Sequence, residues 1–388
     1  MFKYTRCERK YIMLKKKVFI PILAFTCLLS MTACNKKDDM EIKPISMNMD
    51  INEVPYENLE REWSNMTMDK YILRVAQQIW STWNDLDKIW PGVDFSKYNV
   101  LYVEANGNNA WLISSDKEIN KLNAKDLPDK FKAQGNPFMF SSSENTLNGK
   151  PTIKVEVDPE MFNNPYDNGE FKALPNSSML FTFTVHEEFH NYQSTWKIKE
   201  TDQEELLTKG VENFSARTQR LEIINALNKA ILEPEKEQQY LESAKWWFEE
   251  YKKNNKEEYE LTKSIDILEG TARYFDMATN MRSIEGLSIS EEEAFKFYQD
   301  MIREDYNLDA ERFFGLPDEE AYDIGGSSGV LLEKQNNLNW KKEAQQGTPP
   351  LEILLKDYKA VPQQPSQEVE NLVKSIQERR KALESTEE

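Results

Sequence analysis

The chain has 388 residues, of which 11% are aromatic and 30% are charged. This composition is typical of a globular protein and excludes a largely disordered one, and the length can hold one large domain or two small ones. The formal net charge of −18 argues against a nucleic-acid partner, because no concentrated basic surface is available to neutralise phosphates.

The N-terminal segment has the features of an export signal. Three lysines at positions 15–17 precede the apolar stretch VFIPILAFTCLLSM, which is short for a membrane span. The following MTAC, which ends in Cys34, resembles the lipobox of bacterial lipoproteins. That resemblance implies a signal peptide at 1–34, lipidation of Cys34 and an outer-membrane location. The next residues, NKKDD, are similar to a surface-export signal of such lipoproteins. A plain secretory signal or a weak anchor helix is the alternative.

Residues 35–55 are polar and contain two prolines, so we expect them to form a tether. We then expect one folded domain at 56–340 and a charged helical tail at 341–388. All three cysteines lie at or before Cys34, so the folded part offers neither a disulfide nor a thiolate ligand. Any metal held there must be bound by nitrogen and oxygen.

The first part of the folded domain combines helix and strand patterns. An apolar stripe at helical spacing from about Glu57 to Trp90 predicts one or two amphipathic helices. Runs rich in β-branched and aromatic residues predict a small antiparallel sheet from strands at 99–104, 109–114 and 152–157. The segment MLFTFTVHEEFHNYQSTW then predicts a helix.

After Glu200 helical periodicity dominates the sequence, with breaks expected at Pro234 and at 254–255. A further helix is expected from Ser290 to Asp305. The glycine-serine cluster in AYDIGGSSGVLLEK is expected to precede a short helix, and 367–388 to form a solvated helix. The predicted fold class is therefore α+β, predominantly helical, with a small antiparallel sheet before the TVHEEFHNYQ helix.

Both histidines of the chain lie in TVHEEFHNYQ, four residues apart, as His186 and His190. Residues four apart share one face of a helix, so the two imidazoles can converge on one point, and Glu187 falls beside it. This is the HExxH arrangement in which two imidazoles bind Zn²⁺ and the glutamate takes a proton from the zinc-bound water. The second glutamate, Glu188, is expected to point away from the metal. The alternative is a surface helix with two spare histidines.

Catalytic zinc usually has three protein ligands. Because the chain has no third histidine and its folded part no cysteine, the third ligand must be a carboxylate. Two glutamates are candidates. Glu212 stands 22 residues after His190 (212 − 190), near the spacing in thermolysin-like enzymes, whereas Glu269 stands 79 residues after it (269 − 190). The alternative for Glu212 is a buried partner of Arg217 or Arg220, or an acceptor for a histidine N–H.

The segment EGTARY, which begins at Glu269, resembles the E-G-x-A-x-Y stretch that carries the glutamate ligand in many gluzincins. With the HExxH helix, it makes residues 95–335 similar to a group of bacterial gluzincin-like zinc peptidases. The resemblance implies one Zn²⁺ bound by His186, His190 and Glu269, with Glu187 as the general base. It also implies that the glycine after the ligand lets another helix approach closely, and that the tyrosine of EGTARY falls near the metal cleft.

In that group a later tyrosine contacts the oxyanion of the tetrahedral intermediate, and the corresponding residue here is Tyr322. A core tyrosine at a helix start is the alternative. One departure concerns the aspartate that, in the thermolysin pattern, follows the ligand glutamate by four residues and orients a histidine. Here that position is Arg273. We therefore expect Asp276, Asn191 or Gln193 to orient the histidines.

These features predict a zinc metallopeptidase of the gluzincin type, anchored to the cell envelope by lipid and acting on a peptide or protein substrate. The alternative is a non-enzymatic surface lipoprotein that binds a nutrient or a partner and in which the motif is vestigial or structural.

Overall fold

The computed structural model describes residues 44, 67–137, 139–141, 145–159, 178–198, 213–305, 317–337 and 339–385. The predicted signal peptide, with Cys34, lies outside these ranges. The chain divides into two compact units. The sheet unit takes its described residues from Asn35–Thr195 and Phe275–Glu304, and the helical unit from Trp196–Tyr274 and Asp305–Glu388. Within the described ranges, no helix combines the length and apolar character that a membrane span requires.

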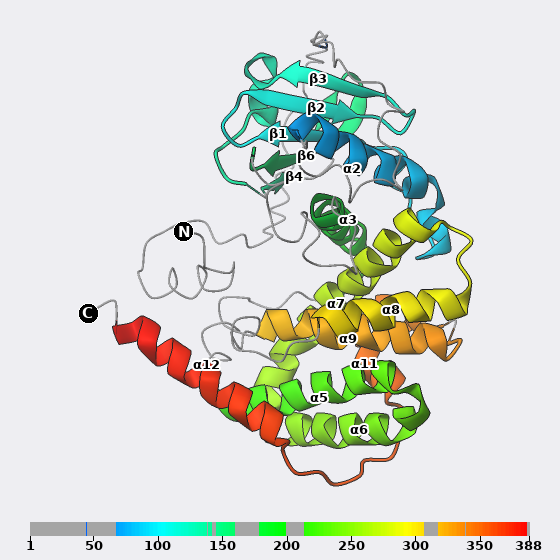
Figure 1. Ribbon diagram of the computed structural model, residues 1–388, viewed down its shortest axis with the longest axis vertical. Helices are drawn as coiled ribbons and strands as arrows, with labels where there is room; N and C mark the ends of the chain where they lie inside the picture. Colours follow the sequence, from blue (N-terminus) through cyan, green and yellow to red (C-terminus); the bar gives the residue numbers. More distant parts are fainter. Residues whose placement is uncertain are drawn as a thin grey trace. The chain divides into compact units, whose positions relative to one another are not determined.

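In the described residues the fold is α+β, predominantly helical, with one small sheet (Figure 1). The sheet has the strand order β3-β2-β1-β6-β4, and β5 also pairs with β6. The strands are β1 (Asn99–Glu104), β2 (Asn109–Ile113), β3 (Ile119–Asn123), β4 (Phe140–Ser141), β5 (Thr146–Leu147) and β6 (Lys150–Val157). Short 3-10 turns at Ala124–Asp126 and Asp129–Phe131 follow β3.

The sheet is mixed, so the prediction of an antiparallel sheet was wrong for its central pair. β1 and β6 run parallel, with Tyr102 opposite Val155. The chain between β1 and β6 contains β2 to β5. It is long enough to return to the end of the sheet at which β1 begins, as a parallel pair requires. Every residue of β1 is buried, which is usual for a strand covered on both faces.

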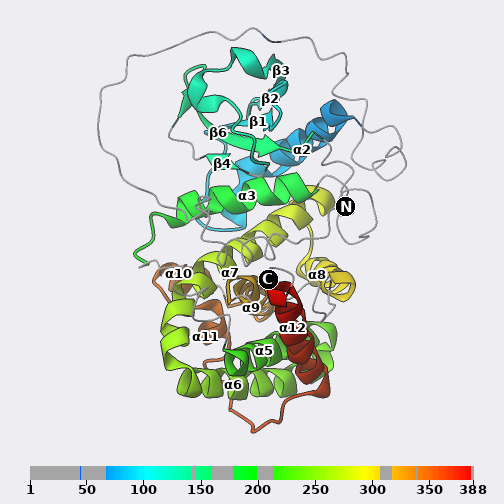
Figure 2. The same cartoon turned by 90° about the vertical axis from the view of Figure 1, so that its left-hand side faces the viewer.

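Two helices of the sheet unit are α2 (Met68–Thr82) and α3 (Ser178–Gln193) (Figures 1 and 2). Polar contacts tie both to the sheet. Asp69 on α2 accepts hydrogen bonds from Trp111 Nε1 (2.8 Å) and Lys121 Nζ (3.0 Å). On α3, Thr184 shares a hydrogen bond of 2.9 Å with the buried Tyr102 hydroxyl. The predicted helix up to Trp90 is α2 followed by a 3-10 helix at Trp83–Lys88.

The other helices follow the predicted breaks closely. They are α5 (Phe214–Leu232), α6 (Glu237–Asn254), α7 (Lys256–Glu285), α8 (Glu291–Asp305), α9 (Pro317–Lys334), α10 (Trp340–Gln345), α11 (Pro350–Leu354) and α12 (Gln367–Ser385). A 3-10 turn at Pro234–Lys236 separates α5 from α6. Helix α7 is continuous, and its residues up to Tyr274 belong to the helical unit and those from Phe275 to the sheet unit.

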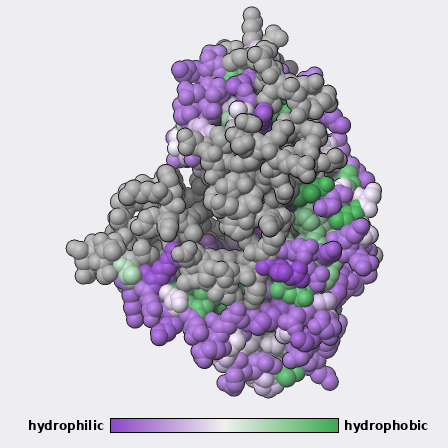
Figure 3. Space-filling model, viewed as in Figure 1, coloured by the Kyte–Doolittle hydropathy of each residue, from purple (hydrophilic) through white to green (hydrophobic). Residues whose placement is uncertain are grey.

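Two expectations for the C-terminal part need correction. The glycine-serine cluster does not precede a helix but lies inside α9, because Gly325 and Gly329 face close helix neighbours rather than a turn. Helix α12 is not fully solvated: Val369, Leu372 and Ile376 are buried, and α12 packs against α5. Their spacing gives the charged helix a narrow apolar stripe. Hydrophilic residues nevertheless dominate the coloured surface in Figure 3, in keeping with the net charge.

Buried ion pairs join three helices of the helical unit. On α5, Arg217 donates to Glu258 of α7 and to Glu320 of α9, the latter at 2.8 Å. Arg220 donates to Glu320 (2.7 Å) and to Asp266 of α7 (2.7 Å). Pairing offsets much of the cost of burying these charges, and the pairs constrain the rotation of α7 about its own axis.

Candidate metal centre

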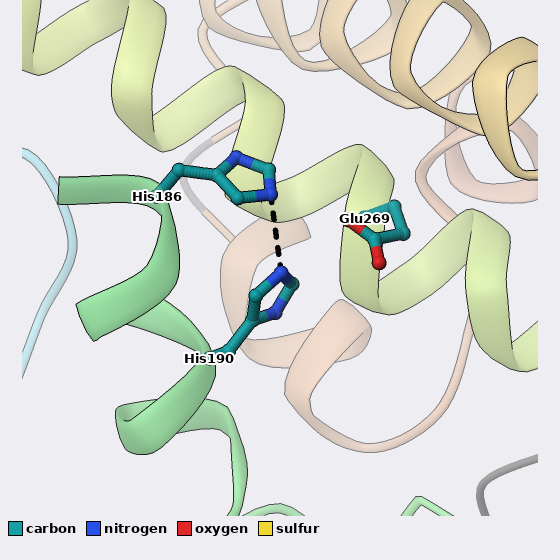
Figure 4. Close-up of side chains that lie close together, drawn as sticks. All are labelled: His186, His190 and Glu269. Atoms are coloured by element: carbon teal, nitrogen blue, oxygen red, sulfur yellow. Dashed lines mark hydrogen bonds between the residues drawn. The ribbon is translucent and has the colours of Figure 1, made fainter. Parts of the chain in front are cut away.

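Helix α3 brings the two histidines together on one face (Figure 4). Their Nε2 atoms lie 3.1 Å apart and their ring centroids 4.7 Å apart. Another side of the helix is apolar: Phe181, Val185 and Phe189 are each fully buried. This burial fixes which way α3 is turned, and so aims both imidazoles at a common point.

The second nitrogen of each ring is hydrogen-bonded to an acceptor. His186 Nδ1 lies 2.9 Å from Asp276 Oδ2, and His190 Nδ1 lies 2.6 Å from Gln193 Oε1. Both partners are oxygen acceptors, so in the tautomer with the proton on Nδ1 each neutral ring would keep the lone pair of Nε2 for a metal ion. Two such lone pairs only 3.1 Å apart repel each other unless a proton or a cation lies between them.

Glu269 completes a possible ligand set. One ligand atom from each of His186, His190 and Glu269 lies within 4.8 Å of the other two (Figure 4). Ligand atoms of a tetrahedral zinc site are about 3.3 Å apart, given metal–ligand distances of about 2.0–2.1 Å. The histidine pair already has about this separation, and a Glu269 oxygen lies within 4.8 Å of both rings' ligand atoms. The residues therefore fit a divalent metal ion held by nitrogen and oxygen.

Helix α7 carries both carboxylates of the site. Glu269 and Asp276 are seven residues apart on one continuous helix, so they lie on nearly the same face, two turns apart. Asp276 is only 2% exposed, which strengthens its contact with His186.

Aromatic packing holds α7 against α3 beside the histidines. The rings of Phe189 and Phe275 are stacked, with centroids 4.2 Å apart. Trp90 meets Phe189 edge-on at 5.1 Å, and Phe95 meets Phe275 edge-on at 6.0 Å. Each stacked ring is the chain neighbour of a site residue, since Phe189 precedes His190 and Phe275 precedes Asp276. This pair was not predicted from the sequence, because nothing local relates Phe189 to Phe275.

The glycine after Glu269 lies at a very close helix crossing. A Cβ added to Gly270 would be 2.7 Å from Gly325 Cα, and one added to Gly325 would be 2.1 Å from Gly270 Cα. The backbones of α7 and α9 therefore touch next to the candidate ligand, as the resemblance implied. The tyrosine of EGTARY differs from the expectation: Tyr274 is buried against Gly329 and Trp340, because five residues turn it away from the face of Glu269.

The two motif glutamates have different surroundings. Glu187 is half-buried, on the same helical turn as His186. Glu188 is 1% exposed, and burial raises its pKa from 4.5 to about 8, against the opposing effects of its hydrogen bond from Asn191 and of Lys97. The amide of Asn191 donates to Glu188 at 2.7 Å, so Gln193 rather than Asn191 bonds a histidine.

The remaining predicted residues are placed as follows. Tyr322 is half-buried on α9, three residues before Gly325. Glu212 lies outside the described ranges, and Arg217 and Arg220 are paired with Glu258, Asp266 and Glu320. No protein-family model, curated protein or solved structure matches this chain.

Proposed function

We propose that the protein is a zinc-dependent hydrolase, namely a peptidase of the gluzincin type with a zincin-like fold. One observation carries the proposal: two Nε2 atoms and the Glu269 carboxylate converge, while both Nδ1 atoms are bonded to acceptors. Structural histidines need no such arrangement. Metal-binding histidines do, because an acceptor at the second nitrogen fixes the tautomer and the ring orientation.

Bound zinc would supply a water of lowered pKa, about 7, and polarise the carbonyl oxygen of a substrate. The residues of the chain do the rest. Glu187 is the one carboxylate of the motif that is partly accessible, so it is suited to accept a proton from the attacking water and pass it to the leaving amine. Glu188 is unsuited to that role, because it is buried and bonded to Asn191.

Two nitrogen donors and one carboxylate also suit other divalent metals, ferrous iron among them. The glutamate directly after His186 favours hydrolysis, since redox chemistry requires no base at that position. The membrane anchor at Cys34 and the proposed outer-membrane location rest on the lipobox resemblance. In this setting, the substrate is a peptide or protein of the cell envelope or its surroundings.

Metal analysis of the purified protein tests the proposal. We expect one zinc ion per chain in the wild type and none in His190→Ala. Glu187→Gln should retain zinc and lose peptide hydrolysis by at least about 100-fold in a peptide-library assay. A wild type purified without stoichiometric metal would contradict the proposal. Peptide cleavage that is as fast in zinc-loaded Glu187→Gln as in the wild type would contradict the base assignment. A zinc-loaded wild type that cleaves no peptide of the library would favour a non-enzymatic lipoprotein.

A further inference from the structure

The buried ion pairs of the helical unit form one cluster of five charged side chains on α5, α7 and α9. Its members are two arginines and three acids, none more than 7% exposed: Arg217, Arg220, Glu258, Asp266 and Glu320. If every group were ionised, the cluster would carry one negative charge without a counter-charge. Such a charge is costly to bury, so the composition of the cluster favours the binding of one proton.

Two of the three acids have both carboxyl oxygens occupied. Asp266 accepts hydrogen bonds from Arg220 at Oδ2 (3.0 Å) and at Oδ1 (2.7 Å). Glu258 accepts from Arg217 at Oε1 and from Asn213 at Oε2, the latter at 2.9 Å. A proton on either acid would compete with a hydrogen bond that is already formed, so neither is the natural place for it.

Glu320 differs from both. Its Oε2 accepts hydrogen bonds from Arg217 (2.8 Å) and Arg220 (2.7 Å), whereas its buried Oε1 has no hydrogen-bond partner among the described residues. A proton on Oε1 therefore breaks no hydrogen bond. With Glu320 neutral, Arg217 still has Glu258 as its counter-charge. Arg220 still has Asp266, so the cluster is balanced and Glu320 is an uncharged bridge between the two arginines.

The electrostatic surroundings also favour a protonated Glu320. Burial raises its pKa from 4.5 to about 7, the two arginines lower the pKa, and Glu258 raises it. The elements around the cluster also carry six acids and tyrosines, namely Tyr251 on α6, Asp266 on α7, Glu319, Tyr322 and Asp323 on α9, and Glu352 on α11. A negative charge on any of these six opposes the ionisation of Glu320.

We propose that Glu320 is a pH-sensitive latch of the helical unit, which joins α9 to both arginines of α5 at least cost while its carboxyl is protonated. Between pH 4.5 and about 7, the folded chain retains a proton that the unfolded chain releases. The stabilisation by the latch is therefore complete below about pH 4.5 and is lost as the pH rises to about 7. A bound metal ion plays no part in this latch.

Infrared spectroscopy detects this proton directly, because the C=O band of a protonated carboxyl is separate from the carboxylate bands. Glu188→Gln serves as the background protein, since Glu188 is another buried glutamate with a raised pKa. At about pH 6, the background should show one protonated carboxyl more than the double variant that also carries Glu320→Gln. At about pH 8.5 this difference should vanish. Equal spectra at about pH 6 overturn the inference.

Denaturant unfolding measures the effect of the latch on stability. Relative to the double variant, the unfolding equilibrium constant of the background protein should rise roughly 100-fold between about pH 4.5 and 7.5. Both proteins keep the metal centre, so its own pH dependence cancels in this ratio. Glu370→Gln, at an exposed site on α12, replaces Glu320→Gln in the control, and its ratio should stay near one.

A ratio that does not change with pH, or one that changes as much in the Glu370→Gln control, overturns the inference. If Glu320→Gln does not fold, the infrared titration of the background protein decides alone. A band from a buried protonated carboxyl that is lost near pH 7 supports the latch. The absence of such a band at about pH 6 overturns it.

Discussion

The rings of Phe189 and Phe275 lie nearly parallel, inclined by 16° with centroids 4.2 Å apart, and both are fully buried. They join the two helices that supply every side chain of the candidate metal centre. Because each is the neighbour of a polar site residue, a shift of either ring moves His190 or Asp276. The apolar packing therefore sets the geometry of the ligands.

Phe275→Leu should loosen the metal centre. We expect a loss of about 1 kcal/mol in the free energy of unfolding, from the aromatic contact, together with weaker zinc binding in a chelator competition assay. Phe131→Leu is a matched control, because Phe131 is equally buried but packs in the sheet core with Leu101 and Leu112. It should show a similar loss of stability with zinc affinity unchanged. Equal effects of both variants on zinc binding would refute the idea.

Asp276→Asn should weaken zinc binding by about 10- to 100-fold while leaving the fold intact. The asparagine oxygen can still accept the His186 Nδ1 proton, so the tautomer is kept and only the negative charge is lost. The amide side chain of Gln193 already plays this neutral role at His190, so Gln193→Met, which removes the acceptor altogether, should weaken zinc as well. Chelator competition measures both affinities, and circular dichroism checks the fold.

Gly270→Ala and Gly325→Ala should both destabilise the protein, although alanine is normally the better helix former. In each case the new methyl group would meet backbone atoms of the facing helix at less than 3 Å, so α7 and α9 must move apart. We expect losses of several kcal/mol, as for overpacked positions. Lys296→Ala, at an exposed site on α8, serves as the control in thermal unfolding. Unchanged melting of both glycine variants would argue against the crossing.

The buried Glu188 should make the protein less stable as the pH rises. Its folded pKa of about 8 lies above its ordinary value of 4.5, so between these values the unfolded chain releases a proton that the folded chain retains. The contribution of the protonated carboxyl to stability is complete below about pH 4.5 and is lost as the pH rises towards 8, at up to about 1.4 kcal/mol per pH unit.

Glu188→Gln should remove this dependence, because a glutamine can keep the hydrogen bond from Asn191 without ionising. The variant should melt at a higher temperature than the wild type at pH 8 and at nearly the same temperature at pH 4.5. Glu187→Gln, one residue earlier and half-buried, is the comparison and should show no such gain. If the difference in melting temperature between wild type and Glu188→Gln is the same at pH 4.5 and at pH 8, the prediction is wrong.

Local patterns predicted much of this structure. The strand at 99–104 coincides with β1, and Pro234 and Asn255 separate α5, α6 and α7 as expected, because both signals act over a few residues. The parallel pairing of β1 with β6 was not predictable in the same way, since it depends on the path of the long intervening chain. The glycines of α9 were also misjudged: a close helix crossing and a turn both need a small residue, and only the partner Gly270 distinguishes them.

In the candidate site, the four-residue spacing of His186 and His190 was enough to predict that their rings converge, because one helix holds both. The choice of Glu269 needed a resemblance, since its sequence distance from His190 has no direct physical meaning once α7 folds back beside α3. Asp276 followed from helical periodicity once Glu269 was assumed. The aromatic stack could not be predicted, because nothing local relates Phe189 to Phe275 until the two helices are docked.

The order in which the chain is synthesised gives one consequence of this arrangement. His186 and its hydrogen-bond partner Asp276 are separated by 90 residues. At a translation rate of about 5–20 residues per second, the two histidines emerge from the ribosome roughly 5–20 seconds before the helix that completes their surroundings. A metal ion that arrives in that interval meets only a bidentate histidine pair. Secure metal capture therefore belongs to the finished chain, after α7 has folded and α9 has locked it in place at Gly270.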